Sequence, residues 1–516
     1  APHPISDQPF QMGFVTIFSI AAALTWLLRL LYFKAKYIYD RMTGMQGPAA
    51  LPLIGNLHQF RFEADEFFEQ AQGLGYMLEE NGDRICRIWF SGLPFVLIYG
   101  AEEVEAVLSS SKVLHKPFHY RFLSAWIGDG LLISDPEKWR PRRKLLTPTF
   151  HYDILKDFVE VYNRHARTLC TRIFETAGGK YADVFHKVTL CTLDIICEAA
   201  LGVNIDAQNT HSPYLDAVMD MKKIVFRRQL APHYYPDFLF RWFGEGREQE
   251  KCVKILHDFT GTAIRARKKM ADEAGGVQNL VEKEAREGRR RMAFLDLMLD
   301  MNAKGDLSLE GICEEVDTFT FEGHDTTSAS INWFLHLMGA NPDKQRRVQQ
   351  ELDEIFGDSD RDVTYEDLSR LKYMEAAIKE TLRLYPSVPI FARQVTEDLR
   401  IKDHLLPTGT GIVIMPSMVH KDTRYWPDPE VFLPERFLDT EANRHPYSYI
   451  PFSAGSRNCI GQRFAIMEEK CVLAILMRQF KVEAKLATHD MRIAAELIIR
   501  PMYGNEIRLT RRKAFS

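Results

Sequence analysis

Cys459 has the sequence surroundings of a metal-binding thiolate. It lies in the segment FSAGSRNCIG, flanked by Gly455 and Gly461, and the helical pattern of Gln462–Phe480 begins directly after it. At such a helix start, free backbone N–H groups and the positive end of the helix dipole stabilise an anion. They lower the pKa of a thiol, and the resulting thiolate is a ligand for a metal ion. Cys471, farther along the same helix, is expected to be a small core residue instead.

A run of polar residues, FEGHDTT, occupies the centre of a second helical pattern, Glu310–Leu337. Asp325 and Thr326 combine a titrating group with a hydroxyl, which is what proton delivery by general-acid catalysis requires. Glu322 and Thr326 are four residues apart and therefore project from the same helix face. Gly323 is a weak helix former, so we expect the helix to open there and leave a pocket. Taken alone, the same residues would also suit a polar helix surface.

Several arginines are candidates for pairing with carboxylates. Glu380 and Arg383 lie three residues apart on one helical face, and Arg436 follows in the segment PERF. Two guanidinium groups around one carboxylate can be buried when every charge is paired and hydrogen-bonded. A tryptophan and three further arginines are also candidates: Trp139, Arg143, Arg393 and Arg457. Any one of these arginines by itself would more often be a solvated surface charge.

The elements that must position these residues are predicted to be mainly helical. Residues 60–395 are dominated by apolar residues at helical spacing, separated by short polar turns. A charged stretch, 269–293, is typical of an exposed loop between two helices. Strand-like runs are few and short: Arg84–Phe90, Phe95–Tyr99, Gly411–Met415 and Ile498–Leu509, the last turning at Gly504–Asn505. The sequence therefore predicts one mainly α domain with a small β part.

The N-terminal region predicts a single-pass membrane anchor. Phe14–Phe33 is an apolar run of about 20 residues, which as a helix spans roughly 30 Å and matches a bilayer core. Basic residues follow it at Lys34, Lys36 and Arg41, whereas the acidic Asp7 precedes it. The positive-inside rule therefore places the bulk of the chain in the cytosol. A buried core helix is one alternative, and a cleaved signal peptide, which would carry its basic residues before the apolar run, is the other.

The domain boundaries follow from this anchor. We expect a short lumenal N-terminus at 1–13, the anchor at 14–33, a basic and proline-rich hinge at 34–59, and the main domain at 60–516. Two prolines and two glycines in the segment GPAALPLIGN argue against continuation of the membrane helix there. A plain linker is the alternative to a stiff hinge.

The composition argues against several classes of function. With 66 basic and 70 acidic side chains the net charge is −4, so no overall basic field favours a nucleic-acid partner. The eight cysteines form no CxxC pair or metal-finger spacing, and they are too sparse for a disulfide scaffold. This usage is typical of a reducing, cytosol-facing environment. The chain also has no glycine-rich dinucleotide loop, so electrons for a redox reaction must come from another protein.

The residues from Phe452 to Gly461 fit the pattern F-x-x-G-x-R-x-C-x-G, the haem-binding signature of the cytochromes P450. The chain resembles this family along essentially its whole length. Longer stretches are similar to family 4 and, within it, to subfamily V: KWRPRRKLLTPTFH, EEVDTFTFEGHDTTSASINW, IKETLRLYPSVPIFARQ and PFSAGSRNCIGQRFA. The resemblance implies the mainly α cytochrome P450 fold, haem b as cofactor and NADPH-dependent monooxygenation by residues 60–516.

The resemblance also implies roles for the candidate residues. Thr326 would hold dioxygen and its incoming protons, and Asp325 would feed protons from solvent through water. Glu322 stands where most cytochromes P450 have alanine, and many members of family 4 link such a glutamate to a haem methyl group. An ester removes a charge that is costly to bury against porphyrin, and a hydrogen bond within the pocket is the alternative. The other implied contacts are Cys459 on the iron; Phe452; Trp139, Arg143, Arg393 and Arg457 at the propionates; and Glu380, Arg383 and Arg436 behind the cysteine loop.

Enzymes of this kind oxidise medium- and long-chain fatty acids, so the resemblance implies hydroxylation at the ω carbon. Substrate contacts are expected from Phe118–Ile133, from residues 220–240 and from the residues after Ser387. Hydroxylation of sterols or foreign compounds is the main alternative. A haem-dependent peroxide isomerase or dehydratase, and a non-catalytic haem sensor or carrier, are more remote alternatives.

The same resemblance implies partners and a location. NADPH–cytochrome P450 reductase would be the electron donor, with cytochrome b5 as a second partner, at the endoplasmic reticulum membrane. An acidic donor can be steered by basic residues near the cysteine. The residues expected to dock it are Arg140, Arg142, Lys144, Arg463 and Lys470, and a solvated surface is an equal alternative for them.

Overall fold

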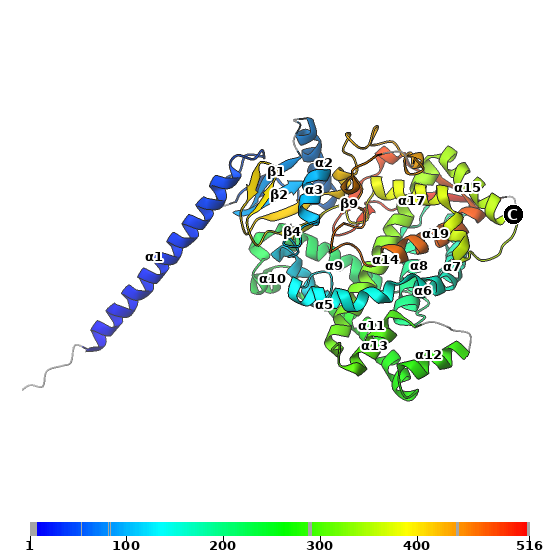
Figure 1. Ribbon diagram of the computed structural model, residues 1–516, viewed down its shortest axis with the longest axis horizontal. Helices are drawn as coiled ribbons and strands as arrows, with labels where there is room; N and C mark the ends of the chain where they lie inside the picture. Colours follow the sequence, from blue (N-terminus) through cyan, green and yellow to red (C-terminus); the bar gives the residue numbers. More distant parts are fainter. Residues whose placement is uncertain are drawn as a thin grey trace, which may run out of the picture.

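The computed structural model describes residues 8–52, 54–80, 82, 84–286, 292–439 and 443–512. A long helix, α1 (Gln8–Met42), extends away from a body in which helices predominate (Figure 1). The expected N-terminal segment 1–13 therefore lies partly outside the described residues and partly in α1.

The helices of the body surround one long central helix, α14. In chain order the helices of the described residues after α1 are α2 (Ala64–Glu80), α3 (Ala101–Leu108), α4 (Ser124–Ile127), α5 (Pro136–Leu146), α6 (Tyr152–Leu155), α7 (Val159–Ala177), α8 (Phe185–Ile196), α9 (Pro213–Leu230), α10 (Asp237–Phe243), α11 (Gly246–Glu273), α12 (Val277–Arg286), α13 (Phe294–Lys304), α14 (Leu309–Ala340), α15 (Pro342–Phe356), α16 (Tyr365–Arg370), α17 (Lys372–Leu384), α18 (Pro416–Val419) and α19 (Gln462–Gln479). The two helices expected at 310–337 and 462–480 are thus confirmed as α14 and α19.

Local signals and burial together set the limits of α14. Its first turn is capped by Ser308, whose hydroxyl accepts a hydrogen bond from the backbone N–H of Gly311 at 3.0 Å. The helix ends before Pro342, which begins α15. Between these ends α14 packs against α8, α11, α17 and α19 and is buried for most of its length. Glu322 and Thr326, near its centre, are only half-buried because they face a cavity.

The strands form small sheets at the side of the body from which α1 emerges and around its C-terminal part (Figure 1). In chain order they are β1 (Ile85–Phe90), β2 (Leu93–Ile98), β3 (Ala182–Asp183), β4 (Phe391–Gln394), β5 (Leu399–Ile401), β6 (His404–Leu406), β7 (Gly411–Ile414), β8 (Phe480–Ala484), β9 (Ile493–Ala495), β10 (Ile499–Pro501) and β11 (Glu506–Arg511). The largest described sheet has the order β1-β2-β7-β4, with β2 and β7 parallel and the other pairs antiparallel. The mainly α fold with a small β part is confirmed.

The expected strand tail at 498–509 is only partly correct. The chain does turn at Gly504, which has a φ of +85°. However, the two strands on either side of the turn do not pair with each other: β10 pairs with β9, and β11 pairs with β8 and β3. The reason is that their apolar residues enter different core clusters, Ile499 with Trp333 and Leu509 with the main core.

The prediction of an exposed loop at 269–293 is wrong for most of its length. Helix α11 continues to Glu273, and α12 follows at Val277–Arg286, whereas residues 287–291 lie outside the described residues. Val277, Leu280 and Glu284 recur on one face of α12 and are buried. Because many residues of this stretch are charged, its narrow buried face is not evident from the sequence.

The expectation that α14 opens at Gly323 is also wrong, because the helix is continuous from Leu309 to Ala340. A Cβ atom at position 323 would meet the side chain of Ile196, at the end of α8. The glycine therefore allows α8 to approach α14 closely, and it does not interrupt the helical hydrogen bonds.

The helix α1 contains the predicted anchor at 14–33. Within the described residues, one helical segment, Phe18–Met42, is long and apolar enough to cross a membrane, with a mean hydropathy of 1.3 and none of its most apolar part buried. The end of α1 is attached to the body, because Met42 and Met45 are buried and the Tyr37 hydroxyl donates to Asp398 at 2.5 Å.

The segment that follows α1 is also bound to the body. The backbone N–H of Arg87 donates to the carbonyl of Gln46 at 2.9 Å, and that of Asn56 donates to the carbonyl of Trp89 at 2.7 Å. Hydrogen bonds to strand β1 thus hold both ends of residues 46–56, so this stretch has the character of a stiff connection.

Arg267 provides a test of this packing. This buried arginine pairs with Glu284 at 2.7 Å and with Asp296 at 2.6 Å, and so joins α11 to α12 and α13. Arg267→Ala leaves two carboxylates without their cation, and we expect it to lower the free energy of unfolding by about 3–5 kcal/mol. Arg265→Ala, at an exposed position on the same helix, should change it by less than about 0.5 kcal/mol. Urea denaturation followed by circular dichroism measures both, and equal effects would contradict the assigned role.

Candidate functional site

The loop that carries Cys459 is shaped by its own backbone and by α3. The N–H of Cys459 donates to the carbonyl of Phe452 at 2.9 Å, and the N–H of Asn458 donates to that of Gly455 at 3.1 Å. Gly455 has a φ of +70°, and a Cβ atom there would overlap the carbonyl oxygen of Leu108 at the end of α3. Only glycine satisfies both requirements, and the tight loop turns the sulfur into the cavity.

The sulfur of Cys459 lies at the start of α19, as predicted. It is accessible only from the cavity, since the surrounding protein encloses it. Burial raises the pKa of this thiol to about 11, and the nearby carboxylate of Glu322 acts in the same direction, whereas the N–H groups of Gly461 and Gln462 and the charge of Arg143 lower it. The protein alone therefore raises the pKa of the thiol, opposite to the lowering expected from the helix start, and a coordinated metal cation would favour the thiolate.

The surroundings of Cys459 determine what kind of metal group can bind. Within the described residues no cluster of three or more His, Cys, Asp or Glu side chains could hold a metal ion. A metal at Cys459 must therefore bring most of its other ligands with it, as the iron of a porphyrin does.

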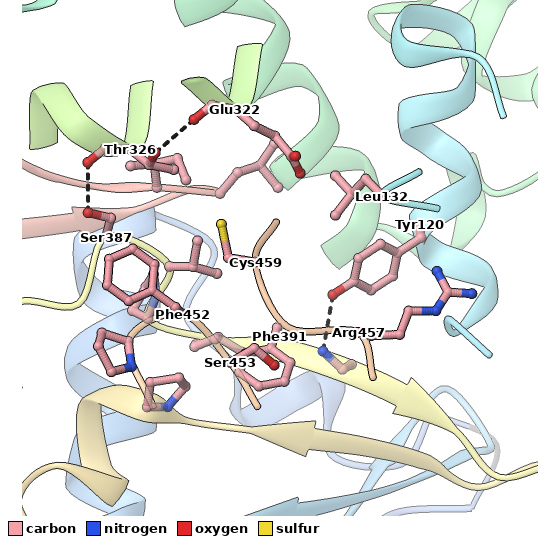
Figure 2. A pocket seen from close by; sticks show the side chains of 18 of the residues that line it. Tyr120, Leu132, Glu322, Thr326, Ser387, Phe391, Phe452, Ser453, Arg457 and Cys459 are labelled. Atoms are coloured by element: carbon pink, nitrogen blue, oxygen red, sulfur yellow. Dashed lines mark hydrogen bonds between the residues drawn. The ribbon is translucent and has the colours of Figure 1, made fainter. Parts of the chain in front are cut away.

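Figure 2 shows α14 crossing the cavity opposite the sulfur, with Glu322 and Thr326 facing into it. The Thr326 hydroxyl donates to the carbonyl of Glu322 at 2.7 Å, and the Ser387 hydroxyl donates to the carbonyl of Thr326 at 2.8 Å. The segment after α17, which lines the cavity, is thus held against this part of α14 by Ser387. Thr326 is placed where a hydroxyl can act on a molecule bound between α14 and Cys459.

The Glu322 carboxylate has no hydrogen-bond or ion-pair partner among the described residues. Burial raises its pKa to about 7, the more distant charges of Lys116 and Arg143 lower it, and that of Glu315 raises it. An acid of this kind is largely protonated or readily protonated near neutral pH, and it is available for a bond to a group in the cavity.

Asp325 does not face the cavity. Its carboxylate forms a buried ion pair with Lys222 of α9, with distances of 2.7 and 3.0 Å, and both side chains are 2% exposed. It lies on the side of α14 that packs against α9 and α11, so it does not touch the space that Thr326 faces. A role in proton transfer therefore requires a route on that side of the helix.

Cationic side chains converge on the cavity below the sulfur. Arg457 donates to the carbonyl of Ser134 at 2.5 Å and lies over the ring of Trp139 at 4.6 Å, and its Nε and Nη1 atoms have no hydrogen-bond partner in the described part of the chain. Arg393 is fully buried, and its guanidinium donates to the carbonyl of Ala392 at 3.0 Å. Burial, together with the charge of Arg393, lowers the pKa of Arg457 to about 10.

Lys116 is a further cation of this group that the sequence analysis missed. Burial, reinforced by the charges of Arg393 and Arg457, lowers the pKa of this lysine well below its usual range. Its ammonium group lies 4.7 Å from the ring centre of Tyr120, whose hydroxyl accepts a hydrogen bond from the N–H of Ala392. A lysine between apolar residues, as in VLHKPF, was the available sequence signal.

These unpaired cations next to an enclosed thiol fit the two propionates of a haem. Buried guanidinium groups with free donors are costly unless an anion accepts their hydrogen bonds. Trp139, Arg143, Arg393, Arg457 and Phe452, all predicted from the sequence, line the same cavity as Cys459. Arg143 donates to both oxygens of Asn458, at 2.7 and 2.8 Å, and so supports the cysteine loop as well as the cavity. The residues present therefore fit haem b.

Helix α5 is held in place by the acidic start of α14. Arg142 donates to Glu315 at 2.7 Å and Lys138 to Glu314 at 2.9 Å. The neighbouring residues Trp139 and Arg143 then point toward the cavity. Arg142 was expected to dock the electron donor, but its guanidinium is engaged in this internal ion pair.

The predicted Glu380–Arg383–Arg436 group is brought together behind the cysteine loop. The Glu380 carboxylate accepts two hydrogen bonds from Arg383, at 2.7 and 2.8 Å, and lies 3.4 Å from Nε of Arg436. Arg383 also donates to the carbonyls of His420 and Pro429 at 2.9 and 2.7 Å. The group thus connects α17 to the irregular segment before Cys459.

The cavity has a volume of about 550 Å³ and is lined mostly by apolar side chains. All three regions predicted to contact substrate line it, through Phe118–Ile133, residues 220–240 and the residues after Ser387. The sequence analysis missed further lining regions, among them α2 and the segment before it, β1 and β2, residues 149–158, residues 196–200 and Ala495–Ile498. These residues carry no distinctive chemistry and become lining residues only through the fold.

An enclosed cysteine at a helix start, a threonine-bearing helix opposite it and a group of unpaired cations define a haem-thiolate site in a mainly α fold. The family model described as "Cytochrome P450" matches residues 45–507. The chain is 44% identical to rat cytochrome P450 4V2, over 97% of this chain and 96% of the relative, and 45% identical to human cytochrome P450 4V2, over 90% and 89%. It is 41% identical to Drosophila melanogaster cytochrome P450 4c3, over 96% and 95%.

The chain therefore belongs to the cytochrome P450 family, and these relatives place it among the monooxygenases of family 4. Haem, when bound here, supplies an iron on which dioxygen is reduced and split. The cationic side chains of the cavity would hold its carboxylates, Cys459 would provide the sulfur ligand, and Thr326 would place a hydroxyl on the opposite face.

Gly455 provides a test of the cysteine loop. Gly455→Ala adds a clash with Leu108 to the cost of a left-handed backbone, which is about 1–2 kcal/mol by itself. We expect the variant to lose most of its haem, measured as bound haem per chain and as the absorption band of the ferrous carbonyl form. Gly357→Ala is the matched control, because Gly357 also has a positive φ (+56°) but open space around it. Full haem content in Gly455→Ala would show that the loop tolerates a side chain.

Proposed function

We propose that this monooxygenase hydroxylates medium- and long-chain fatty acids at the ω carbon. In the balanced reaction, substrate, O₂, two electrons and two protons yield the ω-alcohol and one water. The electrons come from NADPH through a separate flavoprotein reductase. The observation that carries the proposal is the Glu322 carboxylate, which faces the cavity opposite Cys459 without a partner, as in the family 4 enzymes that the sequence resembles.

The lining of the cavity supports an unbranched apolar substrate. On the side of α2, β1 and α9 the aromatic rings lie close together, with Phe60 5.6 Å from Phe90 and Phe67 5.8 Å from Phe226. The polar residues among them are uncharged amides and His119, whose pKa is lowered by burial to about 4. Each methylene of an alkyl chain buried here contributes about 0.8 kcal/mol. A terminal methyl group can thus be directed toward α14 while the carboxylate stays at the outer end.

A covalent ester at Glu322 would serve the selectivity of this reaction. The terminal methyl has the strongest C–H bonds of the chain, so a small displacement of the reacting centre favours an inner carbon. In forming the ester, a haem methyl and the Glu322 carboxylic acid lose two hydrogen atoms. Together with two electrons and two protons from the normal supply, these reduce one O₂ to two waters. The bond removes the buried charge and fixes the haem in the cavity.

The ester is tested by acid–organic extraction after turnover with NADPH and reductase. We expect the haem of the wild-type chain to stay with the protein and that of Glu322→Ala to enter the organic phase. Glu310→Gln, which changes an exposed glutamate in the first turn of α14, serves as the control and should retain its haem as the wild type does. Haem that leaves the wild-type protein freely would rule out the ester.

The reductase is proposed to dock on the basic surface near α5 and the start of α19, with cytochrome b5 as a second donor. Arg140, Lys144 and Arg463 are exposed there and suit the task. Two of the expected residues do not suit it: Arg142 pairs with Glu315, and Lys470 is buried against Glu375. Side chains committed to internal ion pairs are poor contacts for a transient partner.

We propose that α1 anchors the chain in the endoplasmic reticulum membrane, with the body in the cytosol. The exposed apolar surface of Phe18–Met42 and the basic residues Lys34, Lys36 and Arg41 support this orientation. The boundary between an anchor at 14–33 and a hinge at 34–59 stays a prediction. Helix α1 itself runs on to Met42, and Gln46 and Asn56 of the hinge form hydrogen bonds with β1.

Product analysis tests the substrate class. The full-length chain, reconstituted with reductase and NADPH, is offered saturated fatty acids of increasing length, and the position of the hydroxyl is found by mass spectrometry. We expect terminal alcohols to predominate, and Glu322→Ala to shift the products toward inner carbons because the haem is no longer fixed. Oxidation of sterols or foreign compounds in place of fatty acids would overturn the proposed substrate, and turnover of peroxides without NADPH would overturn the reaction type.

A further inference from the structure

A buried polar seam lies on the face of α14 that is turned away from the cavity. Three of its side chains follow one another along the helix at spacings of three and four residues: Asp317, Thr320 and His324. All three are at most 5% exposed, and they face the helices α9 and α11. The seam ends beside Asp325, the residue next to the cavity-facing Thr326.

The outer end of the seam reaches solvent through α11. The Asp317 carboxylate accepts a hydrogen bond from Thr260 at 2.6 Å, and its other oxygen lies 3.6 Å from Nε2 of His257. The side chain of His257 is 45% exposed, whereas that of Asp317 is 6% exposed. Nε2 of His257 hydrogen-bonds to the carbonyl of Trp126 at 2.7 Å, so the ring stands between the buried acid and bulk water without a direct hydrogen bond to Asp317.

The middle of the seam contains polar atoms that no described protein group satisfies. These atoms are the hydroxyls of Tyr214 and Thr320 and the Nε2 atom of His324. The rings of Tyr214 and His324 are 5.8 Å apart, and the charges that act on Tyr214 include those of both Asp317 and Asp325. Buried polar atoms of this kind are normally bonded to ordered water, which can bridge two to four partners.

The protonation states of these groups suit a relay. Nδ1 of His324 lies 2.5 Å from the carbonyl of Thr320, so it carries the hydrogen and leaves Nε2 as an acceptor. Burial lowers the pKa of His324 and raises that of Tyr214 well above its usual range, so both stay neutral. Burial raises the pKa of Asp317 to about 6, while Thr260 and His257 act in the other direction. Asp317 can therefore exchange protons near neutral pH.

The inner end of the seam is the Asp325–Lys222 ion pair. Asp317 and Asp325 are eight residues apart, or about 12 Å along the helix, so a proton needs intermediate carriers between them. Tyr214, Thr320 and His324 occupy this interval. Each turnover consumes two protons together with two electrons, and the cavity itself is lined mostly by apolar groups.

We propose that protons for oxygen reduction enter at His257 and Asp317 and pass along the Tyr214–Thr320–His324 seam to the Asp325–Lys222 pair. Asp325 then passes the proton toward Thr326, either by rotating its side chain or by exchanging Lys222 for another hydrogen-bond partner. The route explains why the acid next to Thr326 faces away from the cavity. It rests on the monooxygenase reaction and not on the identity of the substrate.

Two conservative variants interrupt the route without changing side-chain size: Asp317→Asn and Tyr214→Phe. The control is Tyr162→Phe, which removes the hydroxyl of another buried tyrosine, on α7 beside Phe464. The full-length chain is assayed with reductase, NADPH, O₂ and tetradecanoic acid, and separately with cumene hydroperoxide and the same acid. In the second assay the peroxide and substrate yield two alcohols, with no net uptake of protons or electrons.

We expect both seam variants to form product about tenfold or more slowly with NADPH, since a positioned proton donor contributes roughly 10²–10⁴-fold. More of the consumed O₂ should appear as H₂O₂, and the solvent deuterium isotope effect should rise. With the peroxide, both variants should match the wild type. The double variant should be no slower than the slower single variant, because both residues belong to one route.

The route is overturned if Asp317→Asn and Tyr214→Phe behave as Tyr162→Phe does with NADPH. It is also overturned if they lose activity equally with the peroxide, because that result indicates a structural role. A wild-type chain that oxidises tetradecanoic acid in neither assay contradicts the proposed substrate alone. The share of O₂ released as H₂O₂ without organic substrate is then compared, and a Tyr214→Phe value equal to the wild-type value overturns the route.

Discussion

The enclosure of one sulfur atom beneath an apolar cavity is the constraint on which the rest of this structure depends. Burial raises the pKa of the Cys459 thiol, so a cation bound to the sulfur would be needed to favour the thiolate. The protein meets this constraint with a rigid loop. Gly455 lets the loop pass under Leu108, and the start of α19 directs backbone N–H groups at the sulfur. A looser loop would leave the sulfur unable to hold a fixed position opposite α14.

The charged groups around the cavity follow from the same constraint. Burial at the cavity lowers the pKa of Lys116, Arg393 and Arg457, and the Nε and Nη1 atoms of Arg457 have no hydrogen-bond partner among the described residues. By contrast, Glu380 and Arg383 satisfy each other and the carbonyls of the neighbouring segment, so they need no ligand. The first group thus suits an anionic ligand such as the propionates of a haem, and the second supports the architecture behind the loop. The two groups differ in whether their charged atoms have hydrogen-bond partners, and not in charge alone.

Helix α14 presents different polar groups on its two faces. Glu322 and Thr326 face the cavity, whereas Asp325 and the polar residues before it face α9 and α11. Asp325 is fully buried, so its charge needs a partner. On the outer face it is stabilised by Lys222 and still stands one residue from Thr326. The continuous helix, held closely against α8 at Gly323, keeps these two faces in register.

The sequence by itself determined the chemistry of Cys459 and the family, because the glycines, the arginine and the cysteine must stand at fixed local spacings. It also determined α14, α19 and the apolar part of α1, whose patterns are long and regular. It could not determine the helical state of 269–286, where charge masks a narrow buried face, or the partners of β10 and β11. Nor could it show that Lys116 joins the arginines, or that Asp325 turns toward Lys222. These outcomes depend on which segments distant in sequence meet, and only tertiary packing decides that.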